Sequence, residues 1–165
     1  MFALLAGIAV AEALEALTPA KITLKWPNDI LLGGAKLAGI LIDAVPHAEK
    51  LDWLVIGIGA NLRDAPRIEG RMTTSLAAHG ITLAPQTLAS TVLDRVTHWQ
   101  DQPGEKIRTE WLARGHPAGT PLTIHAGGRI LQGSFIGLSP SGELLLQSEN
   151  RIDTISTGDV LLGAS

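Results

Sequence analysis

The feature that most constrains this sequence is the stretch 25–42, which has the sequence KWPNDILLGGAKLAGILI. Pro27-Asn28 interrupts an apolar segment, which indicates a strand that ends in a bend. Two apolar runs, DILL and AKLAGILI, then flank Gly33-Gly34. A Gly-Gly pair between two such runs predicts a β-hairpin with a two-residue loop. We therefore expect the chain to build a sheet around this hairpin.

A two-residue loop fixes which residues face each other across the hairpin. Asp29 is then opposite Ala38, and Leu31 is opposite Lys36. Side chains alternate between faces along a strand, so these four residues are expected to share one face. The other face would carry Ile30, Leu32, Leu37 and Leu41. Asp29 and Lys36 become diagonal neighbours, roughly 7–8 Å apart. The pair is either part of a functional site or a partly exposed structural ion pair.

A second strand is predicted over residues 51–62, LDWLVIGIGANL. Its alternation places Leu54, Ile56, Ile58 and Ala60 on one face. Gly57, Gly59 and Asn61 then lie on the other. Glycines inside a strand often mark the close approach of a ligand or of another backbone, and they would form a flat floor for a ring. Close helix packing is the alternative. A dinucleotide fingerprint fails because Leu62 occupies the last glycine position.

The rest of the chain predicts the fold class. Residues 2–17 are rich in Ala and Leu, which favours a nearly all-round apolar helix buried against a sheet. Residues 22–26 indicate a strand buried on both faces. Helical spacing over 85–99 and 104–114 predicts a covering layer. Short apolar runs separated by Gly-rich turns follow and predict a small barrel or sandwich. The fold class is α+β, with an antiparallel or mixed sheet covered by helices in residues 1–116 and a small β domain in residues 117–165.

Composition and charge exclude several classes of function. A net charge of −3 provides no basic surface for nucleic acid. The apolar start is too short to span a membrane and lacks the charged n-region of a secretory signal. The absence of cysteine excludes disulfides and thiolate catalysis and fits a cytoplasmic protein. The five histidines lack metal-ligand spacing, so no protein metal site is expected.

KWPND (25–29) followed by KLAGIL (36–41) resembles the signature of biotin protein ligases. Those enzymes activate biotin with ATP and transfer it to a lysine of a biotin carboxyl carrier protein. VIGIGANL (55–62) and the strand-rich C-terminal segment resemble the same family in order and spacing. The resemblance thus covers nearly the whole chain. It implies a class II synthetase-like catalytic domain that is truncated at its N-terminus, followed by an SH3-like barrel.

The resemblance also implies roles for individual residues. Lys36 matches the lysine of KLAGIL, whose ammonium would offset the repulsion between the biotin carboxylate and the α-phosphate of ATP. Asp29 matches the KWPND aspartate, which would orient Lys36 or meet the acceptor lysine. Gly57 and Gly59 match positions whose backbone lies against the biotin ring. The candidates for binding ATP or its phosphates are Lys25, Asn28 and Asn61. Mg²⁺ is expected with ATP, bound through the phosphates more than through protein ligands.

One departure from the family pattern concerns the start of the chain. In the family, an Arg-rich loop of the GRGRxGR type precedes the opening helix and closes over biotin and the adenylate. This sequence begins at the helix, so residues 1–165 alone are expected to bind biotin weakly or not at all and to have negligible ligase activity. An uncovered sheet edge and apolar surface would favour association, with a homodimer as one form. Two other functions stay open: a lipoate-type ligase, and a non-catalytic binding or assembly protein that kept the fold.

Overall fold

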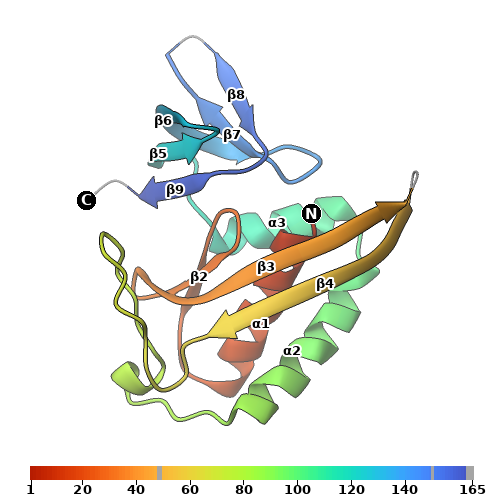
Figure 1. The fold of residues 1–165 in the computed structure, drawn as a ribbon, viewed down its shortest axis with the longest axis vertical. Coiled ribbons are helices and arrows are strands. Elements are labelled where there is room, and N and C mark those ends of the chain that lie inside the picture. Colours follow the sequence, from red (N-terminus) through yellow and green to blue (C-terminus); the bar gives the residue numbers. More distant parts are fainter. Residues whose placement is uncertain (48–49, 150, 163–165) are drawn as a thin grey trace.

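The computed structural model describes residues 1–47, 50–149 and 151–162. In these residues, two antiparallel sheets and three α-helices are arranged as shown in Figure 1. The first sheet has the strand order β1-β2-β3-β4, and the second has the order β8-β7-β6-β5-β9. The prediction of an α+β fold with a helix-covered antiparallel sheet followed by a small β unit is confirmed.

The elements follow one another in simple order along the chain. The first sheet contains β1 (Ile22–Lys25), β2 (Asp29–Leu32), β3 (Ala35–His47) and β4 (Lys50–Ala60). The helices are α1 (Phe2–Leu17), α2 (Pro85–Gln100), α3 (Gly104–Arg114) and the short 3₁₀ helix η1 (Ala77–His79). The second sheet contains β5 (Pro121–Ala126), β6 (Arg129–Leu138), β7 (Leu144–Gln147), β8 (Ile152–Ile155) and β9 (Asp159–Leu162).

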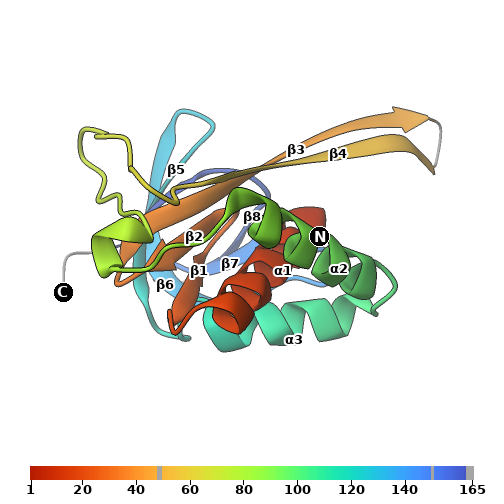
Figure 2. The ribbon, with the colours of Figure 1, turned by 90° about the horizontal axis from the view of Figure 1, so that it is seen from below.

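Helix α1 lies at the centre of the packing. It contacts α2, α3 and strands β1 to β3. Figure 2 shows all three α-helices on one side of the first sheet. Ten of the sixteen residues of α1 are buried, which exceeds the single apolar stripe of a surface helix. Neighbouring helices and the sheet therefore surround it, as its nearly uniform apolar sequence predicted.

The hairpin β2–β3 forms as predicted at its turn but not along its whole length. Leu31 pairs with Lys36, but Asp29 pairs with Gly39 instead of Ala38. The cause is a β-bulge between Ile30 and Leu31, which gives β3 one extra residue relative to β2. The predicted partner of Asp29 is therefore wrong by one residue. From the bulge onward, the residues of β3 lie on the faces opposite to those predicted.

This bulge decides which face of the sheet each side chain occupies. Ile30 pairs with Ala38, and both are buried together with Ile40 on the face that packs against α1. We call this the helix-covered face. Leu41 was predicted there, but it is 73% exposed, because the extra residue moves it to the opposite face. We call that opposite face, which carries Asp29, Gly39, Leu41, Gly57 and Gly59, the open face.

Strand β1 departs from its prediction for a related reason. Ile22 and Leu24 are buried, whereas Thr23 between them is exposed. The strand was expected to be buried on both faces. Helices cover only one face of this sheet, so β1 alternates between buried and exposed residues as a half-covered strand does.

The second sheet packs at one end of the first, where β1 ends and β2 begins (Figure 1). The buried Trp26, between β1 and β2, makes one bond to the C-terminal unit and one to the segment that leads into it. Its indole N–H donates to the carbonyl of Gly142 over 3.1 Å, and its backbone N–H donates to Nε2 of His116 over 3.3 Å. These bonds fix the C-terminal unit beside the end of the hairpin that carries Asp29 and Lys36.

Candidate active site

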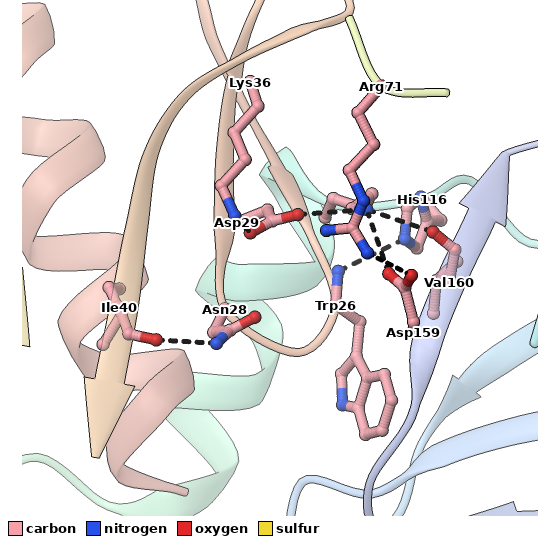
Figure 3. Close-up of polar contacts among 10 residues, drawn as sticks. Trp26, Asn28, Asp29, Lys36, Ile40, Arg71, His116, Asp159 and Val160 are labelled. Atoms are coloured by element: carbon pink, nitrogen blue, oxygen red, sulfur yellow. Dashed lines mark hydrogen bonds and ion pairs between the residues drawn. The ribbon is translucent and has the colours of Figure 1, made fainter. Parts of the chain in front are cut away.

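Asp29 lies between two ammonium groups. It is the first residue of β2 and is buried, with 7% of its surface exposed. Its Oδ1 contacts Nζ of Lys36 (Figure 3), and its Oδ2 is 3.0 Å from Nζ of Lys25. A buried carboxylate without such partners would carry a large desolvation cost. The two lysines therefore balance the buried carboxylate of Asp29, and Asp29 in turn orients both of them.

The side chain of Lys36 lies across Gly39 on the open face. A Cβ placed on Gly39 would come within 3.1 Å of both Cε and Nζ of Lys36. Gly39 is paired with Gly59 on β4, and Leu41 is paired with Gly57. The ammonium of Lys36 is thus brought to the edge of a surface formed by Gly39, Gly57 and Gly59. We call these three glycines the glycine floor.

The glycine floor is unobstructed at Gly59. A Cβ built there would meet nothing within 4 Å, so no neighbouring side chain explains why this residue is a glycine. Close helix packing was the alternative explanation for the glycines. It does not apply, because the helices lie against the other face of the sheet (Figure 2). The open face therefore offers a flat surface with a cation at one end.

The two asparagines make structural contacts. Nδ2 of Asn28 donates to the carbonyl of Ile40 over 2.6 Å, as Figure 3 shows. Nδ2 of Asn61 donates to the carbonyl of Thr74 over 3.0 Å and to that of Lys36 over 3.4 Å. Both amide groups thus hold β3 to its neighbours. Their predicted role in binding ATP would have to use their oxygen atoms.

Two further charged residues reach this site, and sequence reasoning missed both. Arg71, in the loop after β4, forms an ion pair with Asp159, the first residue of β9. Asp159 is also 4.0 Å from Nζ of Lys25. Arg71 and Asp159 are 88 positions apart in the sequence, and no local pattern links them. Only the packing of the C-terminal unit against the hairpin brings them together.

A pocket of about 180 Å³ joins these groups. Its charged lining residues are Lys25, Asp29, Lys36 and Arg71, and its far wall is β9 from Val160 to Leu162. Counting Asp159, three cations face two carboxylates, which leaves one positive charge. The pocket is therefore suited to an anion. Among the described residues, no group of three or more His, Asp or Glu side chains could hold a metal ion.

His116 is a buried titratable group behind this site. It is 6% exposed and packs edge-on against Trp111 and Phe135. Burial, together with the positive charge of Lys25, lowers the pKa of His116 from 6.5 to about 4. Its Nε2 accepts the backbone N–H of Trp26, so the ring is neutral and acts as an acceptor. His116 is thus a structural link between the hairpin and the C-terminal unit.

Comparison with known proteins agrees with this arrangement. Residues 1–113 match the Biotin/lipoate A/B protein ligase family, and residues 119–163 match the Biotin protein ligase C terminal domain. The chain belongs to the Biotin/lipoate A/B protein ligase family. The resemblance to biotin protein ligases and the SH3-like nature of the C-terminal unit are thereby confirmed.

The similar proteins include curated enzymes and solved structures. The chain is 31% identical to the biotin–[acetyl-CoA-carboxylase] ligase of Paracoccus denitrificans over 87% of this chain and 64% of the relative. It is also 31% identical to that of Mycobacterium tuberculosis, over 96% of this chain and 60% of the relative. The biotin protein ligase of Aquifex aeolicus in complex with biotin and ATP covers 99% of this chain and 71% of its own, with a TM-score of 0.79 and 26% identity.

The extent of these matches bears on how much function this chain carries. It spans between about half and two thirds of the length of the curated relatives. The relatives' names therefore describe longer proteins. In residues 1–47, 50–149 and 151–162, no helix has the length and hydropathy needed to cross a membrane.

Proposed function

We propose that this chain contributes the lysine, aspartate and glycine floor of an enzyme that activates biotin with ATP and transfers it to a lysine of a biotin carboxyl carrier protein. The observation that carries the proposal is the position of Lys36. Its ammonium lies at the edge of the glycine floor, paired with a buried carboxylate, within a pocket of net positive charge. A flat surface for a ring and a fixed cation beside it are what biotin activation requires.

The first step joins two anions. A carboxylate oxygen of biotin attacks the α-phosphorus of ATP, a C–O–P linkage forms, and the Pα–O–Pβ bond breaks to release pyrophosphate. Lys36 stands where both anions would converge, and its positive charge offsets their repulsion. This stabilisation is greatest while the new bond forms, so it lowers the barrier more than it strengthens ground-state binding. Asp29 keeps the ammonium in place.

The second step transfers the acyl group. The amine of the acceptor lysine attacks the acyl carbon, and AMP leaves with the bonding electrons. An ammonium is not nucleophilic, so the acceptor must first give up a proton to water. Asp29 is the nearest carboxylate to Lys36 and is the candidate for meeting the acceptor amine. Its two existing lysine contacts favour the orienting role over that of a proton acceptor.

Biotin is favoured over lipoate because residues 119–163 match a domain named for biotin protein ligases. Gly57 and Gly59 would lie under the biotin ring, Asn28 and Asn61 would serve the nucleotide side through their amide oxygens, and Lys25 would add positive charge to the pocket. Mg²⁺ would enter with ATP through its phosphates. The proposal also includes a homodimer that forms through exposed parts of the sheet. It places the protein in the cytoplasm.

The decisive experiment is biotin-dependent exchange of pyrophosphate into ATP. It is measured with residues 1–165 alone and with a peptide that carries the Arg-rich, GRGRxGR-type segment of the family added in trans. Lys36→Ala should reduce the exchange rate by roughly 10²–10³-fold, with little change in ATP binding. Lys21→Ala is the matched control, because Lys21 is an exposed lysine outside the pocket.

Three results would count against this function. An unchanged exchange rate in Lys36→Ala would remove Lys36 from the mechanism. Exchange that depends on lipoate and not on biotin would favour the lipoate-type relative. Retention of biotin binding without any exchange, in the presence of the added segment, would favour a non-catalytic binding protein.

A further inference from the structure

We propose that Arg71 is a phosphate-binding residue, and that Asp159 occupies its guanidinium only until a nucleotide arrives. The inference rests on the proposed function and adds a residue that the sequence did not indicate. Its starting point is that Arg71, which Figure 3 shows beside Asp29 and Lys36, lines the same pocket as these two residues and Lys25.

The backbone around Arg71 is firmly attached to the catalytic hairpin. The N–H of Lys36 donates to the carbonyl of Met72 over 2.8 Å, and the N–H of Thr74 donates to the carbonyl of Lys36 over 2.9 Å. A tight turn precedes Arg71, in which its own N–H donates to the carbonyl of Ile68 over 3.1 Å. Arg71 therefore projects from a backbone that is fixed relative to Lys36.

Lys25, the other cation next to Asp159, has little capacity left for a substrate. Its Nζ is 3.0 Å from Asp29, donates to the carbonyl of Val160 over 3.0 Å, and lies 4.0 Å from Asp159. Two of the three donors of this ammonium are used by Asp29 and Val160, and Asp159 lies beyond hydrogen-bond distance. The side chains of Lys25 and Asp29 are 13% and 8% exposed. Separating this buried pair would leave an unpaired charge away from water, which is costly.

Arg71 is in the opposite situation. Its side chain is 40% exposed and that of Asp159 is 38% exposed, so water can replace either partner at little cost. A guanidinium has five N–H donors in a planar fork and binds phosphate oxygens in pairs. A phosphate carries more charge than the carboxylate it would displace. The exchange of Asp159 for a nucleotide phosphate is therefore favourable for Arg71 and unfavourable for Lys25.

This exchange assigns distinct tasks to the cations of the pocket. Lys36 serves the reacting α-phosphate, Lys25 holds the C-terminal unit to the hairpin, and Arg71 takes a phosphate of the leaving pyrophosphate. Asp159 then acts as a competitor for the same guanidinium. Removing the competitor should tighten anion binding, whereas removing Arg71 should weaken it.

The test is a pair of substitutions with effects of opposite sign. Binding of inorganic pyrophosphate to the whole chain is followed by NMR titration to millimolar concentrations. Arg71→Met should weaken binding by about 10-fold or more, since hydrogen bonds to charged groups are the stronger ones. Asp159→Asn should tighten it, by up to about 5-fold. Arg67→Met, at an exposed arginine of the same loop, has the same change in charge and should have a much smaller effect.

Each outcome bears on the assignment. Weaker binding in both Arg71→Met and Asp159→Asn would mean that the ion pair serves only to support the fold, and it would overturn the proposal. So would an Arg71→Met variant that binds pyrophosphate as the wild type does. A wild-type chain without pyrophosphate binding would overturn it as well, together with the nucleotide site.

Kinetics separate this proposal from the proposed function. In the pyrophosphate-exchange assay with the added segment, Arg71→Met should raise KM for ATP and leave KM for biotin unchanged. Normal exchange with unaltered ATP kinetics in Arg71→Met would reject the role of Arg71 while the ligase function stands. The absence of any exchange in the wild type would reject the function itself.

Discussion

The two faces of the first sheet are formed by the same strands, yet they serve opposite purposes. Ile40 and Leu41 are neighbours in β3. Ile40 lies on the helix-covered face and is 3% exposed, whereas Leu41 lies on the open face and is 73% exposed. The helix-covered face carries branched aliphatic side chains that pack against α1. The open face carries the glycine floor, the charged pair Asp29–Lys36 and the exposed side chain of Leu41.

The difference shows how a sheet covered on one face can be stable and still leave the glycine floor uncovered on the other. Apolar area buried on one face provides the main stabilisation of the sheet. The open face is then free to omit side chains where a ligand must approach closely. Changes on the helix-covered face should therefore alter stability, and changes on the open face should alter binding.

The strongest test exchanges neighbouring residues of β3 for alanine. Ile40→Ala should lower the free energy of unfolding by about 2–5 kcal/mol, because it leaves a cavity beneath α1. Leu41→Ala removes a side chain of the same size and should change it by less than about 0.5 kcal/mol. Urea denaturation of both variants measures the difference. Equal losses would show that the open face is covered in solution.

A second test uses the pH dependence of stability that the buried His116 should cause. The pKa of His116 is lowered to about 4, while the unfolded chain takes up the proton near pH 6.5. The unfolded state therefore binds more protons between these values, and stability falls as pH falls through that window. We expect a loss of about 2 kcal/mol between pH 7 and pH 5.

His116→Gln separates this contribution from other titrating groups. Glutamine keeps an acceptor for the backbone N–H of Trp26 but does not titrate in this range. Its unfolding free energy should be nearly flat between pH 7 and pH 5. His98→Gln, at an exposed histidine, should retain the wild-type slope. A wild-type curve without any decline would show that His116 is not buried as a neutral ring.

The sequence predicted the elements of the fold well because their signals are local. The apolar run of α1, the Gly33-Gly34 turn and the alternation in β4 each lie within one short segment. The bulge at Ile30/Leu31 could not be predicted, since it depends on how β2 and β3 fit against their neighbours. One extra residue was enough to move Leu41 to the opposite face.

The site was predictable to the same extent. Asp29 and Lys36 belong to one hairpin, so spacing alone brought them together, and their catalytic roles stay predictions. Arg71 and Asp159 come from separate parts of the chain, and only tertiary packing makes them neighbours. The structural contacts of Asn28 and Asn61 were missed for a different reason. An amide suits a backbone carbonyl as well as a phosphate, and the sequence does not show which one it meets.

A smaller effect is expected for the glycine on the helix-covered side. Gly7 lies inside α1, where a Cβ would be 3.7 Å from Leu24 and 3.9 Å from Ile40, which are ordinary contact distances. Alanine is a better helix former than glycine by about 0.5–1 kcal/mol. Gly7→Ala should therefore raise the free energy of unfolding by about that amount in urea denaturation. A loss of stability would mean that α1 and the sheet pack more tightly than these distances indicate.

The smallest effect on stability, and the most informative one, is expected at Gly59 on the open face. A Cβ there meets nothing within 4 Å and the backbone is not in the left-handed region, so Gly59→Ala should leave the unfolding free energy nearly unchanged. Under the proposed function, the added methyl group would project into the space of the biotin ring. A clash of this kind costs roughly 1–3 kcal/mol, which predicts about 10-fold weaker biotin binding. Calorimetry with biotin, in the presence of the added Arg-rich segment, measures the effect. Unchanged affinity in a stable Gly59→Ala variant would remove the glycine floor from the biotin site.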